Sequence, residues 1–405
     1  MTTPLAATVP NPTPAERNAE LMRELERRMV AHLAAGGTTD MAPSPMRNPG
    51  RAYTDPLRLE AEKRELFHKL PLLAGFSRDI EKPGDVMLFD AAGPAIMIVR
   101  TRSGEAKAFL NMCTHRGAKL VRECSRRNLI TCPFHAWSFD LEGRLVAMPG
   151  DASFEGVDRT TRGLIPVPVG EWRGLIFVKA HPGEEVIDVE RWLGDLAPIM
   201  EGLELDKAGP VKLSQVEVDC NWKFALDTYG EGYHFSALHP ATFGTETCSN
   251  TILYQQFGLH YRVNFVHKSY LDLVDKDERD WPATPYGGSH LLFPNTILYS
   301  APMEGGGRMI GLYRLFPGEG PGSSVTLMST YRAADAPEST PDEAFAQAHD
   351  YIEQVVRTED YSVSKDGQRN LEHAPEGFEL IYGRNEAAIQ NNHRNIARLI
   401  GLPVE

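Results

Sequence analysis

The sequence predicts an α+β fold, with an N-terminal antiparallel β domain followed by a larger domain in which helices flank a twisted antiparallel sheet. Between residues 71 and 182, short apolar runs alternate with Gly, Pro and Asp turns, which is typical of short antiparallel strands. From residue 183 to 405, longer strand-like segments lie between stretches with helical periodicity, which is the α+β pattern. The length of 405 residues suits two domains.

The first 70 residues are expected to form an N-terminal extension with two helices. Residues 1–14 are rich in Pro, Thr and Ala and are predicted to be a disordered lead-in. Apolar residues then recur every four positions among Glu and Arg over residues 15–35, which predicts an amphipathic helix. Asp55-Pro56 is a favourable start for a second helix, which is expected to reach His68.

The second domain is expected to alternate between helices and long strands. Helices are predicted at 192–200, 220–239, 340–371 and 385–399, and strands at 256–267, 290–300, 308–316 and 324–331. Gly143 and the run Gly305-Gly306-Gly307 are predicted to form hairpin turns.

Composition narrows the possible functions. The net charge of −13 argues against a nucleic-acid partner, because phosphate binding needs a basic surface. The sequence has no secretory signal and no run of 18 apolar residues, so a cytoplasmic protein without a membrane partner is expected. Five cysteines in a long chain do not suggest a disulfide framework, and their thiols are therefore available as metal ligands.

Four residues in the first domain form a metal-binding pattern. Cys113 and His115 are followed by Cys132 and His135, so each of two short segments supplies one thiolate and one imidazole. Structural zinc sites usually pair Cys with Cys and His with His at longer spacings. A Rieske-type [2Fe–2S] cluster needs two Cys on one iron and two His on the other, which the mixed pairs supply. The pattern therefore favours a Rieske cluster over zinc.

A second group of potential ligands lies in the second domain. A mononuclear Fe(II) oxygenase site uses two His and one carboxylate and leaves positions open for dioxygen. His234 and His239 are five residues apart, so on an ideal α-helix they would point about 140° apart. A π-bulge or a local unwinding is needed to bring them to one metal, and such irregularities are frequent at functional sites.

Both patterns resemble those of the Rieske non-haem iron oxygenases. Cys113-x-His115-Arg-Gly-Ala with Cys132-Pro-Phe-His135-x-Trp is similar to the cluster motif of that family, and Asn221-Trp-Lys-x₃-Asp-x₃-Glu-x-Tyr-His-x₄-His239 to its iron motif. The resemblance implies the catalytic alpha subunit of an aromatic ring-hydroxylating-type oxygenase. In the family the third iron ligand is a carboxylate on a late helix, and Asp360 is favoured over its neighbour Glu359. Glu353 and Asp366 are equally plausible by their chemistry.

The resemblance also assigns a role to Glu231 and implies partners for the chain. An acidic residue at this position in the family hydrogen-bonds an iron His and a cluster His of the neighbouring subunit. A homotrimer is therefore expected, and the resemblance leaves open whether a beta subunit is also present. A ferredoxin or an NADH-dependent reductase would supply electrons. No nucleotide-binding glycine motif is present, so NADH oxidation is expected on a separate protein.

The substrate remains the least determined feature. The leading hypothesis is hydroxylation of an aromatic ring by dioxygen, and the alternative is removal of an N-methyl or O-methyl group by a monooxygenase. A third hypothesis is a protein that is not an enzyme, either a Rieske electron carrier or a zinc-stapled binding protein. Candidate pocket walls are Phe224, Asp227, Leu238 and the strand at 290–300; Asp227 would attract a cationic amine.

Overall fold

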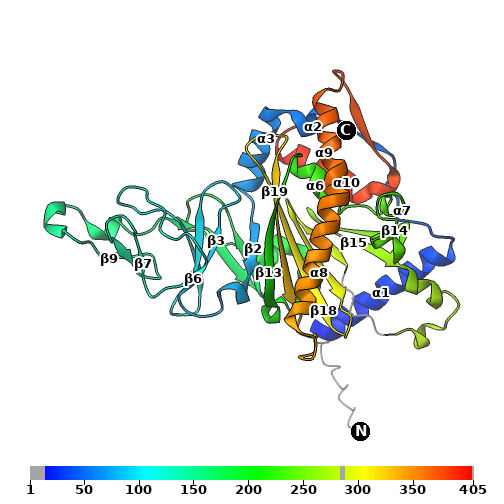
Figure 1. Ribbon diagram of the computed structural model, residues 1–405, viewed down its shortest axis with the longest axis horizontal. Helices are drawn as coiled ribbons and strands as arrows, with labels where there is room; N and C mark the ends of the chain where they lie inside the picture. Colours follow the sequence, from blue (N-terminus) through cyan, green and yellow to red (C-terminus); the bar gives the residue numbers. More distant parts are fainter. Residues whose placement is uncertain (1–13, 283–287, 404–405) are drawn as a thin grey trace, which may run out of the picture.

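The structure is a computed structural model that describes residues 14–282 and 288–403. Figure 1 shows an elongated molecule in which a β-rich part extends from a larger body of sheet and helices. This arrangement confirms the α+β prediction. The lead-in expected at residues 1–14 lies outside the described residues except for Pro14, which begins the amphipathic helix α1 (Pro14–Ala34). Within the described ranges, no helix has both the length and the apolar character to cross a membrane.

The β-rich part consists of three small antiparallel sheets whose strands pair only with one another. Their orders are β10-β5-β4-β3-β6, β11-β12-β2 and β7-β8-β9. The strands are β2 (Leu72–Phe76), β3 (Asp85–Phe89), β4 (Ile96–Arg100), β5 (Ala106–Leu110), β6 (Ser125–Arg126), β7 (Ile130–Thr131), β8 (Ser138–Phe139), β9 (Leu145–Ala147), β10 (Pro166–Val167), β11 (Val169–Trp172) and β12 (Leu175–Val178). Gly143 has a φ of 85° in the turn between β8 and β9, which confirms the predicted hairpin tip.

A seven-stranded antiparallel sheet forms the centre of the larger body, in the order β13-β19-β18-β17-β16-β15-β14. Its strands are β13 (Gly209–Val218), β14 (Thr247–Phe257), β15 (His260–His267), β16 (Ser289–Leu292), β17 (Thr296–Pro302), β18 (Arg308–Pro317) and β19 (Ser324–Arg332). Two predicted strands, 256–267 and 290–300, are in fact each interrupted by a tight turn, at Gly258-Leu259 and at Phe293–Asn295. The edge strand β13 was not predicted from the sequence; its alternation of more and less exposed residues is broken by a bulge between Pro210 and Lys212.

Helices cover this sheet (Figure 1). They are α2 (Arg51–Thr54), α3 (Pro56–Glu62), α4 (Val189–Leu193), α5 (Ala197–Gly202), α6 (Trp222–Asp227), α7 (Phe235–Leu238), α8 (Asp342–Val355), α9 (Tyr361–Glu372) and α10 (Ala387–Leu399). Asp55 caps α3 by accepting a hydrogen bond from the backbone N–H of Leu57, as the Asp-Pro start predicts. A two-stranded sheet of β1 (Met46–Pro49) and β20 (Glu379–Tyr382) ties the N-terminal segment to the C-terminal one.

The two parts share a packed boundary. Phe76 of β2 lies against Tyr331 of β19, with ring centroids 4.3 Å apart. The Tyr331 hydroxyl donates to the buried carboxylate of Asp79 at 2.9 Å, and Arg314 of β18 donates to the backbone carbonyl of Ala74. Since strands do not pair across this boundary, the division near residue 182 suits the topology, and its position stays a prediction.

A buried ionic cluster joins α3 to α6. Glu62 is fully buried and accepts hydrogen bonds from the Lys223 ammonium at 2.6 Å, the Trp222 indole at 2.9 Å and the Arg58 guanidinium at 3.1 Å. Lys223 is also fully buried, and burial lowers its pKa to about 8. These contacts attach the N-terminal segment to the helix that leads into the second predicted metal site.

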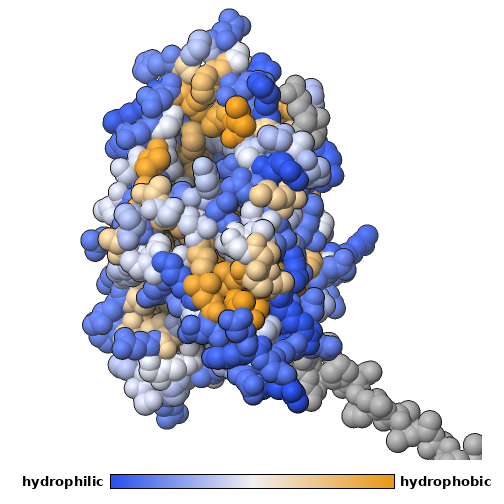
Figure 2. All heavy atoms as spheres, turned by 90° about the vertical axis from the view of Figure 1, so that its right-hand side faces the viewer, coloured by the Kyte–Doolittle hydropathy of each residue, from blue (hydrophilic) through white to orange (hydrophobic). Residues whose placement is uncertain are grey.

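The surface is visible in Figure 2 on one side of the molecule. Figure 2 shows that the face on the right of Figure 1 is mainly hydrophilic, with separate hydrophobic patches rather than one continuous apolar area. This face therefore has no continuous apolar area of the kind that binds a large apolar partner.

Candidate metal centres

The two candidate histidines come together because the expected helix is broken. The predicted continuous helix at 220–239 is wrong: α6 ends at Asp227 and the four-residue α7 begins at Phe235. Two glycines, Gly230 and Gly232, lie in the connecting segment, and glycine disfavours helix. His234 and His239 therefore flank α7, and their rings face each other with centroids 5.1 Å apart.

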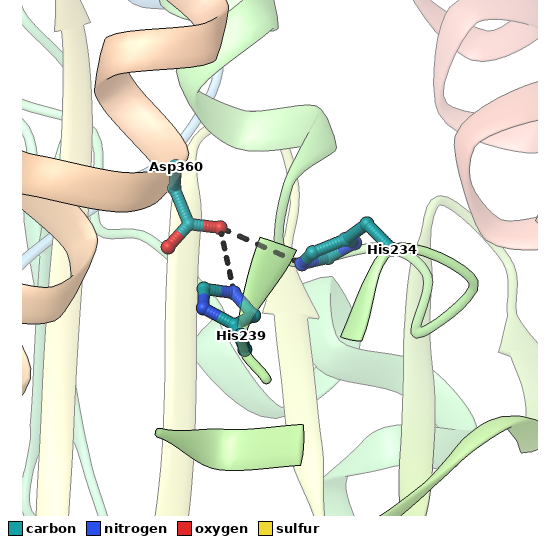
Figure 3. Close-up of side chains that lie close together, drawn as sticks. All are labelled: His234, His239 and Asp360. Atoms are coloured by element: carbon teal, nitrogen blue, oxygen red, sulfur yellow. Dashed lines mark ion pairs between the residues drawn. The ribbon is translucent and has the colours of Figure 1, made fainter. Parts of the chain in front are cut away.

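Asp360 reaches the histidines from a distorted turn in the predicted late helix. Between α8 and α9, residues Val356–Asp360 form a π-helical turn, η10. The Oδ1 atom of Asp360 lies 3.5 Å from Nε2 of His234 and 3.4 Å from Nε2 of His239 (Figure 3). Of the two irregularities expected at the histidines, local unwinding is the one found there. A π-helical turn carries the carboxylate, in keeping with the frequent occurrence of π-bulges at functional sites.

His234, His239 and Asp360, named here the metal triad, form a plausible single-ion site. One ligand atom from each lies within 4.8 Å of the others, and within the described ranges no other group of three His, Cys, Asp or Glu side chains satisfies this spacing. Nε2 of His234 is buried and has no hydrogen-bond partner, as expected for an atom that binds a metal. Two imidazoles and one carboxylate match the ligand set of mononuclear Fe(II) oxygenases.

The other nitrogen of each imidazole is held by a second carboxylate. Nδ1 of His234 hydrogen-bonds to Glu231, which also accepts from the backbone N–H of Tyr233. Nδ1 of His239 lies 2.6 Å from Glu359 Oε2, which accepts a further hydrogen bond from the Thr242 hydroxyl at 2.9 Å. Such carboxylate–histidine pairs set the tautomer so that Nε2 faces the metal. The sequence analysis missed this role of Glu359, for which the adjacent acidic pair was the only signal.

The charges around the metal triad favour the binding of a cation. Burial lowers the pKa of His234, but the neighbouring carboxylates of Asp360 and Glu231 outweigh burial and raise it to about 9. Burial raises the pKa of Asp360, but the two imidazoles outweigh this effect and the pKa is lowered. A divalent ion bound here would displace imidazole protons and take over their pairing with Asp360.

Replacing Glu359 should weaken metal binding without abolishing it. In Glu359→Gln, the amide can still hydrogen-bond His239 but carries no charge to increase the basicity of the ring. We expect metal affinity to fall by roughly 10- to 100-fold, which is the usual effect of losing such a partner. Metal titration of the stripped protein measures it, with Glu353→Gln, less than two turns earlier on α8, as the matched control. Unchanged affinity in Glu359→Gln would contradict this role.

The four candidate ligands of the first domain lie on two facing loops. In one loop the backbone carbonyl of Cys113 accepts from the N–H of Gly117 at 2.9 Å, and in the other that of Cys132 accepts from Ala136 at 3.1 Å. Gly117 and Ala136 have positive φ values of 75° and 57°, so each loop turns back sharply. The two loops therefore bring Cys113 next to Cys132 and His115 next to His135.

Within this site the thiols and imidazoles are paired by type. Cys113 and Cys132 are buried and contact each other, and both burial and this contact raise the pKa of Cys113. The rings of His115 and His135 have centroids 4.8 Å apart, and Nδ1 of His135 is buried without a hydrogen-bond partner. Two neighbouring thiols beside two neighbouring imidazoles suit a two-iron cluster, in which each iron takes one type of ligand.

A cavity of about 450 Å³, named here the triad cavity, opens beside the metal triad. Seven of its lining residues are Phe or Tyr, and within the described residues the wall includes no Lys or Arg. The aromatic members are Tyr229, Phe235, Phe243, Phe265, Tyr270, Tyr299 and Tyr313. The hydroxyls of Tyr299 and Tyr313 bond to each other at 2.5 Å, and that of Tyr229 bonds to Tyr361 at 2.9 Å. The inner wall therefore offers ring surfaces rather than free donors.

Three predicted pocket walls are wrong, and one is correct. Asp227 lies outside the triad cavity, where it accepts from the Tyr53 hydroxyl at 2.6 Å and pairs with His393 at 3.0 Å. Phe224 stacks near Tyr53, and Leu238 does not line the cavity either. The predicted strand at 290–300 does contribute, through Ile297, Tyr299 and Ser300.

Comparison with known proteins identifies both parts of the chain. Residues 71–165 match the Rieske [2Fe-2S] domain, and residues 205–402 match the catalytic domain of the ring hydroxylating alpha subunit. The chain is 28% identical to the carnitine monooxygenase oxygenase subunit of Escherichia coli (strain K12), over 80% of this chain and 83% of that protein. It is 32% identical to the biphenyl 2,3-dioxygenase alpha subunit of Rhodococcus jostii, over 45% and 41%.

A solved structure extends the similarity to the fold. A quaternary ammonium Rieske monooxygenase in complex with L-carnitine superimposes with a TM-score of 0.71 at 21% identity, covering 89% of this chain and 96% of the other. At this identity the match establishes the fold alone.

Proposed function

Because the chain belongs to the Rieske non-haem iron oxygenases, as the alpha subunit that forms their terminal oxygenase component, we propose that it removes a methyl group from a methylated amine. This is the alternative among the hypotheses from sequence, and the comparisons favour it over aromatic ring hydroxylation. The similarity to the carnitine monooxygenase subunit runs over four-fifths of both chains, whereas that to the biphenyl dioxygenase subunit covers less than half of either.

The observation that carries the proposal is the aromatic wall of the triad cavity. Tyr229, Tyr299 and Tyr313 line this cavity, and the only carboxylate among its described lining residues is Asp360. Aromatic faces attract an alkylated ammonium group through cation–π interactions, which gain strength where water is excluded. Among the described residues, no guanidinium or ammonium group lines the wall to repel the cation. The same lack of a cationic partner favours a substrate whose remaining part is uncharged, because a substrate carboxylate would find only His267 and hydroxyls.

The chain's own residues divide the work between the two metal sites. The cluster and the mononuclear iron, when bound, supply electron transfer and dioxygen activation. We assign Cys113, His115, Cys132 and His135 to the cluster and the metal triad to the iron. Glu231 and Glu359 keep the protons of His234 and His239 on Nδ1, so that both Nε2 atoms stay free for the metal. The aromatic wall orients the methyl group and excludes water.

Electrons are proposed to pass between subunits. In Figure 1 the loops beside β7 lie at one end of the molecule, and α7 with the metal triad lies in the larger body toward the other. A head-to-tail ring of three chains would bring the cluster of one subunit to Glu231 of the next. Tyr233, beside Glu231, is 63% exposed and so lies at the surface where such a contact would form. A ferredoxin or an NADH-dependent reductase, in the cytoplasm, would reduce the cluster.

Replacing Glu231 should separate electron transfer from metal binding. In Glu231→Gln we expect turnover to fall by about 100-fold or more, since the charged link to His234 is lost. The cluster should keep its visible absorption, and chemical reduction should still be complete. Stopped-flow reoxidation of the reduced protein with substrate and dioxygen measures the step. Equal reoxidation rates in Glu231→Gln and the parent protein would contradict the proposed role.

The substrate class is tested by product analysis with a reductase and NADH. The panel consists of trimethylammonium and dimethylamine compounds with an uncharged tail, the same compounds ending in a carboxylate, and neutral aromatic hydrocarbons. We expect formaldehyde in a 1:1 ratio with the demethylated amine, with the uncharged tail preferred. A diol or phenol without formaldehyde would support ring hydroxylation instead and overturn the proposal.

A further inference from the structure

A second cavity of about 340 Å³ lies between β1, the α2–α3 segment and α10. Four of its lining side chains are arginines and one is a carboxylate, Asp55. This is unusual in a chain whose net charge is −13. We name it the arginine cavity; it is separate from the triad cavity and shares no lining residue with it.

Arg58 is the arginine of this wall whose side chain is held in place. Its side chain is only 8% exposed, and its Nε donates to Glu62 at 3.1 Å. Its two terminal nitrogens donate to no acceptor within the described residues, although they are not sealed from solvent. A guanidinium held by Nε alone presents its remaining N–H groups in a rigid fork, which fits the two oxygens of a carboxylate or phosphate.

Two further arginines add charge that the surrounding protein does not neutralise. Arg394 of α10 is half-buried and Arg51 of α2 is exposed, and neither forms an ion pair with any residue in the described ranges. Arg47, by contrast, pairs with Glu379 at 2.9 Å. Asp55 already accepts the N–H of Leu57 as the cap of α3. The wall formed by Arg51, Arg58 and Arg394 therefore has an excess of positive charge.

Apart from Asn48 and His393, the remainder of the wall is apolar. Met46, Leu57, Ala397, Ile400 and Leu402 line it, and Leu57 is 81% exposed. A bare inorganic anion would leave this surface in contact with water, whereas a ligand with an apolar body would cover it. We propose that the arginine cavity binds a small organic anion, with its acid group on Arg58 and Arg394 and its apolar body against α10.

Occupation of this site would act on the helix that precedes the metal triad. Arg58 shares Glu62 with Lys223 and Trp222 of α6, and α6 leads directly to Glu231 and His234. An anion on Arg58 would offset part of the positive charge that Arg58 and Lys223 impose on each other and would stabilise this junction. The expected sign is an increase in thermal stability on binding.

The test uses the full-length protein with its metals, and benzoate, hexanoate, phenyl phosphate and inorganic phosphate as probes. Benzamide and hexanamide serve as uncharged matches. We expect the organic anions to raise the melting temperature and to bind in calorimetry, and the amides to do neither. Arg394→Gln and Arg51→Gln, singly and together, should weaken binding by roughly tenfold or more, the usual loss for a charge-assisted pair. Arg398→Gln, exposed on the same helix but outside the cavity, should bind as the parent does.

Each result bears on the proposal. Preference for phenyl phosphate over benzoate would support the site and identify its ligand as a phosphate ester. Equal binding of amides and anions, or binding that survives both arginine substitutions, would overturn it. So would a change in oligomeric mass in Arg51→Gln or Arg394→Gln without any effect of anions, because the surface would then be a contact between subunits. Since Arg51 is exposed, its variant keeps the test valid if Arg394→Gln fails to fold.

Discussion

Asp360→Asn is expected to lose the mononuclear iron and nearly all oxygenase activity while keeping the cluster. The side chain is almost fully buried, and its Oδ1 lies within 3.5 Å of the Nε2 atoms of both His234 and His239. A neutral amide there removes the one negative charge of the triad, so that two neutral imidazoles alone must hold a divalent ion. Because removal of a partner outside the ligand shell already costs 10- to 100-fold, the loss on removing a ligand should exceed about 100-fold.

The measurement combines metal analysis with optical spectra. Iron should fall from about three to about two per chain, with acid-labile sulfide and cluster absorption unchanged. Asp366→Asn is the matched control, because Asp366 is an exposed acid on α9 that was a candidate ligand by chemistry alone. Retention of three irons in Asp360→Asn, or loss of iron in Asp366→Asn, would show that the carboxylate ligand is assigned incorrectly. If metal analysis found zinc in place of iron, the proposal that the protein is an oxygenase would be wrong.

Glu62→Ala should be the most destabilising single change in the body of the protein. Removing the carboxylate leaves Lys223 and Arg58 facing each other in the interior with no counter-charge, and leaves the Trp222 indole N–H without its acceptor. Breaking a buried ion pair from one side costs about 3–5 kcal/mol, because the remaining charge stays buried. A large fall in melting temperature is expected, together with reduced iron occupancy, since α6 precedes Glu231 and His234.

Two further variants test whether the uncompensated buried charge, rather than lost packing, destabilises Glu62→Ala. Glu60→Gln, exposed on the same helix, should change stability by no more than about 0.5 kcal/mol. The double variant Glu62→Gln with Lys223→Met removes the charges of the fully buried pair and leaves only that of Arg58, whose terminal nitrogens are not sealed from solvent. It should therefore recover much of the stability lost in Glu62→Ala. If the double variant is as unstable as Glu62→Ala, the uncompensated charge is not the cause.

Local patterns predicted well wherever local chemistry decides the structure. The amphipathic α1, the Asp55-capped α3 and the turn at Gly143 depend on residues adjacent in the chain, and the structure confirms them. Predictions failed where tertiary contacts override propensity. The segment 220–239 has a helical composition, yet the chain leaves the helix at Asp227, and that break is what lets His234 face His239.

By itself the sequence determined the fold class, the family and the set of residues from which both metal sites can be built, because ligand types and their spacing are local properties. Only the tertiary structure decided between the neighbours Glu359 and Asp360. Both lie on η10, but the π-helical turn directs Asp360 to the Nε2 atoms and Glu359 to Nδ1 of His239. Distant segments also decided the place of Asp227, which Tyr53 and His393 hold outside the triad cavity. The direction of a side chain depends on the residues that pack around it, and these cannot be read from the residue type or from its spacing in the sequence.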